Sequence, residues 1–401
     1  MNQTTDHNLG KGFRILFVSA YNAISGGTIM LFEHAHRMQN NGYDVSITFK
    51  DVNQEISLAV FPHSSDLNII EYKSETKFDV VIATYWSVIY DLSVFDAKHY
   101  VYFSQCDERL FYEMENPIRF WVEQTYTLKN IPIIASAKFL AKRYETEFGA
   151  DTYYLPYGMD LEKFNPSGRH KNDKIRVLIE GAGKAKIKRV ADAFEVVKNI
   201  PNIEVWYVTY DNHSEPEWKA DRIFRSVPYS EMPEIYRSCD ILIKLSEVES
   251  FGLPNLEMMA CGGAIITSNF TGHEEYAIDG KNAFVVEIGD VASARKRLFE
   301  LIENRELLNQ FKQAGIAAAS QRNWDTLTPD LTSVLLSILK KQERGNAEGC
   351  IDRLRTMRLA FKERQEMFAN LKYLQSWRDQ IAEREKQLGY RIAAKFHNII
   401  K

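Results

Sequence analysis

The sequence predicts an α/β protein in which two parallel-sheet units follow one another and a helical segment comes last. Three observations support this prediction. Short apolar runs alternate with stretches of helical periodicity along most of the chain. A polar stretch with Pro and Gly, residues 165–173, interrupts the alternation, which then starts again. Strand signals end near residue 340. Strands that alternate with helices pair in parallel, because each helix returns the chain to the starting edge of the sheet.

The first unit opens with a strand–helix–strand pattern. Residues 13–20 are an apolar run typical of a buried strand, and a loop with two glycines follows at 25–28. Residues 29–40 have helical periodicity and end at Asn-Gly, and residues 43–49 form the next apolar run. We expect the further strands of this unit at 79–83, 99–103 and 132–136, and a further helix at 137–148.

The second unit repeats the alternation. Its expected strands lie at 175–180, 203–209, 241–245 and 264–268, and its expected helices lie at 188–198, 231–238 and 254–261. Two doubly wound sheets are the expected result. The predicted domain boundaries are 1–165 for an N-terminal domain, 166–340 for a C-terminal domain and 341–401 for a helical tail.

The composition excludes several classes of protein. The chain has 401 residues, of which 45% are apolar and 26% are charged, so disordered and fibrous proteins are excluded. The net charge of −4 is too balanced to favour a nucleic-acid partner. The four cysteines form no C-x-x-C pair, which favours a reducing compartment. The first twelve residues are polar and no apolar run approaches 18 residues, so we expect neither a signal peptide nor a transmembrane helix.

The tail, residues 341–401, differs from the rest of the chain in charge and pattern. It contains 14 Lys and Arg against 8 Asp and Glu, a net charge of +6. Its apolar residues recur at helical steps without a clean heptad, at Ile351, Leu354, Phe361, Phe368, Leu371, Leu374, Trp377, Ile381 and Leu388. Such a stripe can pack on the chain's own domains, form a coiled coil with another helix, or lie on an anionic membrane. We predict that the tail mediates assembly or localisation.

The segment 249–263 carries the clearest chemical signal. Gly252 permits a tight turn after an apolar strand, and Pro254 suits the first turn of a helix. The free N–H groups at such a helix start bind anions or hydroxyl oxygens. Glu249 and Glu257 then lie on either side of the turn, at the strand ends where open α/β sheets bind ligands. The alternative is that Glu257 only complements the helix dipole.

This segment reads E-S-F-G-L-P-N-L-E followed by M-M-A-C-G-G, and it resembles the E-x7-E segment of the retaining glycosyltransferases of family 4, which have the GT-B fold. Residues 155–160, L-P-Y-G-M-D, resemble the P-x-G-V-D interdomain segment of that family. Residues 272–283 resemble its G-x-x-E-x-x-x-x-G-x-N-G stretch. The resemblance covers residues 13–335 and implies two Rossmann-like domains that face a cleft.

The resemblance implies transfer of a sugar from a nucleotide diphosphate sugar with retained anomeric configuration. Glu249 matches the acid beside the donor sugar, and Glu257 matches the acid that binds the ribose hydroxyls. The turn residues that match the family's contacts to sugar and phosphate are Phe251, Gly252 and Leu253. No second carboxylate is placed as a covalent nucleophile. We therefore favour front-face transfer, in which the leaving phosphate helps to deprotonate the acceptor hydroxyl.

The diphosphate of such a donor needs positive charge. The basic candidates that follow Gly181-Ala182-Gly183 are Lys184, Lys186, Lys188 and Arg189. Cations there neutralise charge on the leaving diphosphate, which a metal ion does in other enzymes. Lys188 matches the family's second cation and is, with Glu249, a catalytic candidate, whereas Lys184 stands where the family often has Arg. The alternative is a solvated basic helix start.

The N-terminal half contains two further candidate regions. Gly26 and Gly27 resemble the family's first glycine loop, which approaches the diphosphate from the opposite domain, although tight packing also explains a Gly pair. The stretches Y-F-S-Q-C-D-E at 102–108 and E-Q-T-Y at 123–126 resemble a polysaccharide-assembling subgroup that includes bacterial rhamnosyltransferases of surface glycans. Gln105 and Asp107 are the acceptor-side candidates, and ordinary polar loop residues are the alternative.

No metal or other cofactor is expected. His34 and His36 are two residues apart on a helix and face different directions, so we do not expect them to form a metal pair.

We expect a metal-independent retaining glycosyltransferase of bacterial polysaccharide biosynthesis. Its substrates are a nucleotide diphosphate sugar, with dTDP-rhamnose preferred, and a glycan or lipid-linked acceptor. We expect it in the cytoplasm or at the inner face of the membrane, with self-association or a glycan-assembly partner through the tail. An inactive GT-B scaffold and a GT-B nucleotide-sugar epimerase are the alternatives. The sequence does not identify the nucleotide, the sugar, the acceptor or the oligomeric state.

Overall fold

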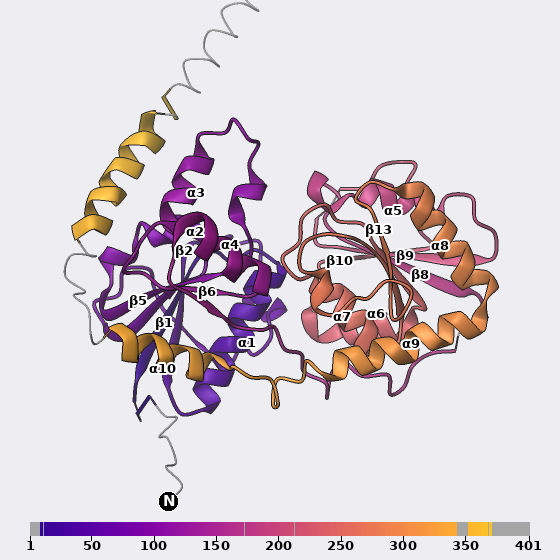
Figure 1. Ribbon diagram of the computed structural model, residues 1–401, viewed down its shortest axis with the longest axis horizontal. Coiled ribbons are helices and arrows are strands. Elements are labelled where there is room, and N and C mark those ends of the chain that lie inside the picture. Colours follow the sequence, from indigo (N-terminus) through magenta and orange to yellow (C-terminus); the bar gives the residue numbers. More distant parts are fainter. Residues whose placement is uncertain are drawn as a thin grey trace, which may run out of the picture. The chain divides into compact units, whose positions relative to one another are not determined.

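The computed structural model describes residues 9–10, 12–171, 173–211, 213–342, 352–367 and 369–370 (Figure 1). The chain divides into two units, Met1–Ala347 and Glu348–Lys401. The larger unit holds one sheet of seven strands and one of six. Every strand pairing in both sheets is parallel, as the alternation of strands and helices predicts.

The first sheet has the strand order β3-β2-β1-β4-β5-β6-β7. Its strands are β1 Arg14–Tyr21, β2 Asp44–Asp51, β3 Asn68–Ile69, β4 Lys77–Ala83, β5 Asp96–Ser104, β6 Ile133–Ala135 and β7 Thr152–Tyr154. The helices between them are α1 Gly26–Asn40, α2 Trp86–Ile89, α3 Ile118–Tyr126 and α4 Lys138–Phe148. Figure 1 shows α1 on one face of this sheet and α2, α3 and α4 on the other. The short 3₁₀ helices are η1 Leu58–Val60, η2 Leu92–Val94 and η3 Glu108–Phe111.

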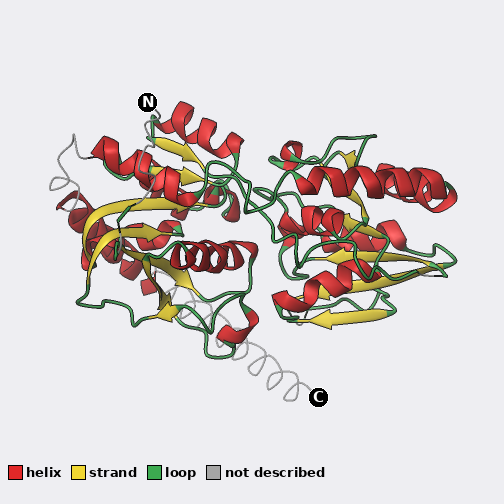
Figure 2. Cartoon of the chain, turned by 90° about the horizontal axis from the view of Figure 1, so that it is seen from below, coloured by secondary structure: helices red, strands yellow, loops and turns green. Residues whose placement is uncertain are grey.

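The second sheet has the strand order β10-β9-β8-β11-β12-β13. Its strands are β8 Ile175–Glu180, β9 Ile203–Thr209, β10 Arg222–Arg225, β11 Ile241–Lys244, β12 Ala264–Ser268 and β13 Phe284–Val286. The helices are α5 Val190–Val197, α6 Met232–Ser238, α7 Leu253–Ala260, α8 Val291–Glu303 and α9 Arg305–Ser320, with 3₁₀ helices η4 Lys186–Lys188, η5 Tyr229–Glu231 and η6 His273–Glu275. Helix α5 packs against α8, and α7 packs against α6 and α9 (Figure 1). Figure 2 shows helices flanking the strands of both sheets.

All the strands that we predicted from apolar runs are confirmed. The central ones are buried along their length; in β1, Ile15 and Phe17 have no exposed surface and neither do their neighbours Leu16 and Val18. Helices on both faces of a parallel sheet explain why such strands read as continuous apolar runs. The sequence did not predict β3, β7, β10 and β13, which have two to four residues each. Strands this short give no periodic signal; β6 and β11 are as short but lie within longer apolar runs of the sequence, which is why they could be predicted.

The helix predicted at 188–198 starts later, at Val190. Lys186–Lys188 form the 3₁₀ turn η4, and Arg189 has a left-handed backbone with φ of 47°. This break separates Lys188 from α5 and leaves its side chain on the loop that follows β8. The position of Lys188 therefore depends on the turn and not on the helix.

Helix α10, Leu331–Gln342, returns to the first sheet and packs against α1. Nζ of Lys341 lies 2.6 Å from Oδ1 of Asp151, just before β7. Residues 331–340 thus pack with elements of the first sheet, although the predicted boundary assigns them to the second domain. Near this return, Gly158 makes room for Trp324: a Cβ on Gly158 would lie 2.4 Å from the indole ring. Only glycine fits the L-P-Y-G-M-D segment at this point.

In the smaller unit, residues 352–367 and 369–370 are helical, in agreement with the helical periodicity of the tail. The apolar positions predicted at Ile351, Phe368, Leu371, Leu374, Trp377, Ile381 and Leu388 lie outside the described residues. Within the part of the chain that the structure describes, no helix has the length and apolar character needed to cross a membrane.

Candidate active site

A pocket of about 450 Å³ lies at the carboxyl ends of strands from both sheets. In the first sheet, β1 and β4 are the neighbours between which the strand order changes direction, and in the second sheet β8 and β11 are. Such switch points leave a crevice where open α/β sheets bind ligands. The pocket lining follows this rule, because Tyr21 and Thr84 come from the ends of β1 and β4, and Glu180 and Lys244 from the ends of β8 and β11.

Four charged side chains form a network in the pocket wall. Nζ of Lys188 lies 2.8 Å from Oε1 of Glu249. Nζ of Lys244 lies 3.3 Å from the same oxygen and 2.6 Å from Oε2 of Glu180. The hydroxyl of Ser246 also donates to Oε1 of Glu249, at 2.9 Å. Two cations and two anions thus alternate across the switch point of the second sheet.

The network keeps its buried members ionised. Burial alone would raise the pKa of Glu249, but the charges of Lys188 and Lys244 lower it to about 2. Burial would lower the pKa of Lys244, yet Glu180 and Glu249 raise it above its ordinary value. The sequence analysis missed Lys244, which is 3% exposed. Its signal was a lysine at the end of the apolar strand I-L-I-K, where a charge needs buried partners.

Glu257 lies outside this network, on α7. Its two carboxylate oxygens accept hydrogen bonds from the hydroxyls of Tyr229 and Tyr236, each at 2.8 Å. Burial raises the pKa of Glu257 to about 7, and the two tyrosine hydroxyls limit that rise. Glu257 is 4% exposed and lines the pocket. Sequence reasoning placed Glu257 but not its tyrosine partners, which come from η5 and α6 and are close only in the fold.

The turn between Glu249 and α7 is built for close packing. Gly252 has a left-handed backbone with φ of 74°, and a Cβ there would lie 2.6 Å from the ring of Phe270. The hydroxyl of Tyr276 donates to the Gly252 carbonyl oxygen, at 3.2 Å. No side chain caps the start of α7 at Leu253, and Gly252, Leu253 and Pro254 line the pocket. Pro254 has no N–H and that of Asn255 donates to the Gly252 carbonyl oxygen at 3.0 Å, so the backbone N–H of Leu253 is the donor that this helix start offers.

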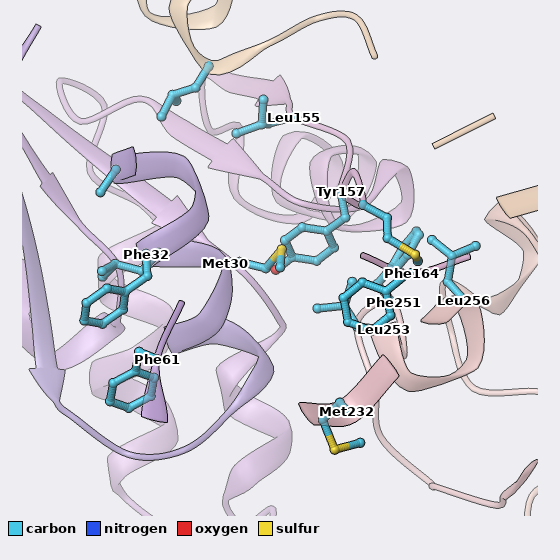
Figure 3. Close-up of a cluster of buried hydrophobic side chains, with 14 of the residues drawn as sticks. Met30, Phe32, Phe61, Leu155, Tyr157, Phe164, Met232, Phe251, Leu253 and Leu256 are labelled. Carbon is cyan, nitrogen blue, oxygen red and sulfur yellow. The ribbon is translucent and has the colours of Figure 1, made fainter. Parts of the chain in front are cut away.

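Phe251 joins the turn to the residues after β7. Its ring meets the ring of Tyr157 edge to face, with centroids 5.4 Å apart, and Figure 3 shows both side chains beside Leu253. Tyr157 also donates a hydrogen bond to Oε1 of Gln105, at 2.8 Å. The amide nitrogen of Gln105 in turn donates to the Gly27 carbonyl oxygen, at 3.0 Å. These contacts connect the turn to the loop before α1.

The start of α1 forms the facing wall of the pocket. Ser25 caps the helix, because its hydroxyl oxygen accepts from the backbone N–H of Thr28, at 3.2 Å. A Cβ on Gly26 would be in ordinary contact with Leu253, 3.5 Å from its Cδ1. At Gly27 a Cβ would be 3.3 Å from Nε2 of Gln105. Both glycines and Gln105 line the pocket.

A buried acid that the sequence analysis missed lies on the same side of the pocket. Glu108, in η3, accepts hydrogen bonds from the hydroxyl of Tyr102 and from the backbone N–H of Trp86. Burial raises its pKa to about 8, so the carboxyl group is largely protonated at neutral pH. Aromatic residues surround it in the pocket lining, namely Tyr21, Tyr85 and Phe111. The sequence Q-C-D-E-R does not indicate that Glu108, and not Asp107, lines the pocket.

Four of the predicted candidates lie outside the pocket lining, namely Lys184, Lys186, Arg189 and Asp107. Lys184 is exposed, and its backbone N–H donates to Oδ2 of Asp211, at 2.9 Å. Asp107 is buried, and its Oδ2 accepts from Arg109 at 2.8 Å and from Arg143 at 2.9 Å. These two arginines lower the pKa of Asp107 although burial opposes them. The contacts that we predicted for Lys184 with the donor and for Asp107 with the acceptor stay predictions.

Comparison with known proteins agrees with this architecture. Residues 219–318, which include Glu249 and Glu257, match the model of the family described as glycosyl transferases group 1. N-acetyl-alpha-D-glucosaminyl L-malate synthase of Bacillus anthracis is 26% identical over 187 residues, which cover 43% of this chain and 49% of that protein. The chain thus spans about half the length of this curated relative.

Solved structures extend the likeness to most of the chain. Sucrose-phosphate synthase from Thermosynechococcus elongatus has a TM-score of 0.67 at 14% identity, over 82% of this chain and 99% of that one. HepE from Anabaena, solved in complex with UDP-glucose, has a TM-score of 0.66 at 14% identity, over 82% of this chain and 99% of that one. These likenesses show the GT-B fold, within which the family model matches residues 219–318.

Proposed function

We propose that this protein is a retaining glycosyltransferase that uses a nucleotide diphosphate sugar as donor. The observation that carries the proposal is the Lys188–Glu249 ion pair, which lies in a pocket at the switch points of both sheets, beside the uncapped start of α7. An anionic leaving group, a cation beside it and an acid beside the sugar are the groups that glycosyl transfer from a diphosphate requires.

The pocket supplies positive potential for the diphosphate from three sources. The N-termini of α1 and α7 both line it, and helix N-termini attract phosphate through their free N–H groups. Lys188 supplies a full charge at the same place. We infer that the donor phosphates lie between Gly26–Gly27 and the Phe251–Gly252–Leu253 turn. These groups and Lys188 then stabilise the charge that develops on the leaving diphosphate, and we propose no metal for this step.

Glu257 is the proposed ribose-binding group, because an ionised carboxylate can accept from two hydroxyls at once. Glu249 is the proposed partner of the donor sugar, and Lys244 keeps it ionised and oriented. In the transfer step, the acceptor hydroxyl oxygen forms a bond to the anomeric carbon while the bond from that carbon to the diphosphate oxygen breaks. The acceptor proton passes to the leaving diphosphate, which leaves by the same face.

The acceptor is proposed to bind on the first-sheet side, near Gln105. That side presents aromatic rings and a protonated Glu108 but no lysine or arginine in the pocket lining of the described residues. Aromatic faces with nearby hydroxyl and carboxyl groups suit a neutral sugar ring. This supports a glycan or lipid-linked sugar acceptor, as in bacterial polysaccharide assembly. A rhamnosyl donor stays part of the proposal on the strength of the sequence resemblance alone.

The test is a donor screen. The purified chain is incubated with UDP-, dTDP- and GDP-sugars, with and without sugar acceptors, and release of the nucleotide diphosphate is measured. We expect release with one donor class, and an anomeric proton coupling in the product that matches the donor. Glu249→Gln should slow release on the order of 100-fold, whereas Glu247→Gln should not, because Glu247 is outside the pocket lining and its side chain is 52% exposed. No release with any donor would contradict the proposal and favour the inactive scaffold.

A further inference from the structure

A second cluster of chemically active side chains lies on α1, away from the pocket lining. It consists of His36 on α1 and of His63 and Asp66 in the turn that follows η1. The ligand atoms of the three residues all lie within 4.8 Å of one another. The two imidazole rings are stacked, with centroids 3.7 Å apart and planes inclined by 5°. None of the three residues lines the pocket.

We propose that His36, His63 and Asp66 bind a divalent transition-metal ion, with Zn²⁺ as the natural probe. Two imidazole nitrogens and one carboxylate oxygen are a donor set of zinc, whereas Mg²⁺ and Ca²⁺ prefer oxygen ligands alone. Ligand atoms on a tetrahedral zinc lie roughly 3.3 Å apart, because Zn–N bonds are about 2.0–2.1 Å long. A metal ion lies in the plane of each imidazole that binds it, so the two rings, which are parallel here, must turn about their Cβ–Cγ bonds to aim both nitrogens at one ion, and the exposed Asp66 must turn toward it as well.

One nitrogen of each ring is available for the ion. Nδ1 of His36 is buried and has no hydrogen-bond partner, which is costly unless a ligand satisfies it. Nε2 of His36 lies 2.9 Å from the side-chain amide of Asn40, and an amide turned to accept from Nε2–H leaves the Nδ1 lone pair free. Nε2 of His63 lies 3.4 Å from Oε1 of Glu33, the usual arrangement of a metal-bound histidine with a carboxylate behind it. A water molecule can complete the coordination, as it does in zinc sites with three protein ligands.

The turn that carries His63 is held against α1 in a conformation that suits a ligand. His63 has a left-handed backbone with φ of 57°, which is uncommon for a residue other than glycine. The amide of Gln39 donates to the Asp66 carbonyl oxygen, at 2.9 Å. Phe61 stacks on Phe32 with centroids 4.9 Å apart, and Figure 3 shows the two rings facing each other. Because Phe61 also lines the pocket, an ion at His63 would fix one pocket wall to α1.

The test uses the full chain after treatment with EDTA and gel filtration. Titration with Zn²⁺ should show one saturable site by calorimetry, and saturation should raise the thermal midpoint. Co²⁺ should give visible d–d bands of a low-symmetry site with nitrogen ligands. His63→Asn tolerates the left-handed backbone, and Asp66→Asn changes an exposed residue, so both variants should fold; each should weaken Zn²⁺ binding at least tenfold.

The matched control is His170→Gln, which removes an exposed histidine that pairs with Glu234, Nε2 to Oε1 at 2.7 Å. This variant should bind Zn²⁺ like the wild type. Absence of saturable binding, or equal binding in wild type, His63→Asn and Asp66→Asn, would overturn the proposal. Loss of binding in His170→Gln alone would also overturn it and move the site elsewhere.

Discussion

Lys188 and Glu249 form an ion pair, Nζ to Oε1 at 2.8 Å, across the switch point of the second sheet. Lys188 follows β8 and Glu249 follows β11, so the pair bridges the two strand ends between which the pocket lies. In the proposed reaction, a donor diphosphate competes with Glu249 for Lys188. Lys244, 3.3 Å from the same oxygen, leaves Glu249 with a cationic partner when Lys188 turns to phosphate. The buried lysine therefore makes the exchange feasible.

Replacement of the two acids should impair different kinetic parameters of the proposed reaction. Glu249→Ala should lower kcat on the order of 10²–10³-fold with a small change in donor affinity, because its contact strengthens as charge develops on the sugar. Glu257→Ala should weaken donor binding by about 1–3 kcal/mol, the cost of lost charge-assisted hydrogen bonds. Single-turnover rates and donor Kd separate the effects. Unchanged kinetics in both variants would remove the basis of the site assignment.

Removing the buried lysine should be costly for stability as well as for activity. Lys244→Met fills about the same volume but leaves the half-buried Glu180 and Glu249 beside one cation fewer. We expect a loss of about 3–5 kcal/mol in the free energy of unfolding. The pKa of Glu249 should rise, so the acid limb of the kcat profile should move to higher pH. Lys198→Met, which breaks the exposed pair with Glu195, should change neither quantity. Wild-type stability and pH profile in Lys244→Met would contradict the proposed network.

The sequence predicted the fold well because its signals are local. Continuous apolar runs gave the buried strands, and the E-x7-E segment gave the turn, the helix and the two acids that flank them. The turn residue Gly252 and the cation Lys188 could also be placed, since each lies beside a strand end. In a parallel sheet the carboxyl ends of the strands meet at one edge, so residues that follow different strands come together there.

The sequence failed where partners come together from distant segments. Tyr236 reaches Glu257 from 21 residues away, and Glu180 reaches Lys244 from 64 residues away. The ring of His36, on α1, stacks on the ring of His63 in the turn after η1. The spacing of His34 and His36 in the sequence does not reveal this neighbour. The spacing of Lys184 predicts a diphosphate contact that stays a prediction; Lys188, in η4, lines the pocket and Lys184 does not.

Treatment with EDTA should affect the proposed metal site but not the transfer reaction. Because Lys188 and two helix N-termini supply the positive potential, turnover should survive EDTA, while the thermal midpoint should fall if zinc leaves His36 and His63. The assay is run below the midpoint, with turnover and unfolding measured on the same sample. Complete loss of turnover that Mg²⁺ or Mn²⁺ restores, with the midpoint unaffected, would count decisively against metal-independent transfer.

The tail should be dispensable for chemistry on a soluble acceptor. Truncation after Ala347 keeps the Lys341–Asp151 contact and removes the smaller unit. We expect unchanged turnover with a changed molar mass in light scattering, or reduced recovery with anionic vesicles, because the tail is basic and carries an apolar stripe. A variant that folds, keeps its mass and vesicle recovery, and yet cannot turn over would show that the tail belongs to the catalytic unit.

Donor affinity should depend on pH through Glu257. Its pKa is raised to about 7, so the carboxylate that accepts from ribose is progressively lost as the pH falls below that value. UDP should therefore bind more weakly at about pH 6 than at about pH 8, approaching a tenfold change in Kd per unit well below the pKa. Phosphate also titrates near about pH 6, and Glu257→Gln retains that contribution while losing the rest. Comparison with the variant's profile thus isolates the contribution of the Glu257 carboxylate. Glu234→Gln, which changes an exposed acid on α6, is the matched control.

With dTDP, whose sugar lacks the 2′-hydroxyl, the difference between wild type and Glu257→Gln should be smaller than with UDP. Superimposable profiles for wild type and Glu257→Gln with UDP would mean that Glu257 does not bind the ribose.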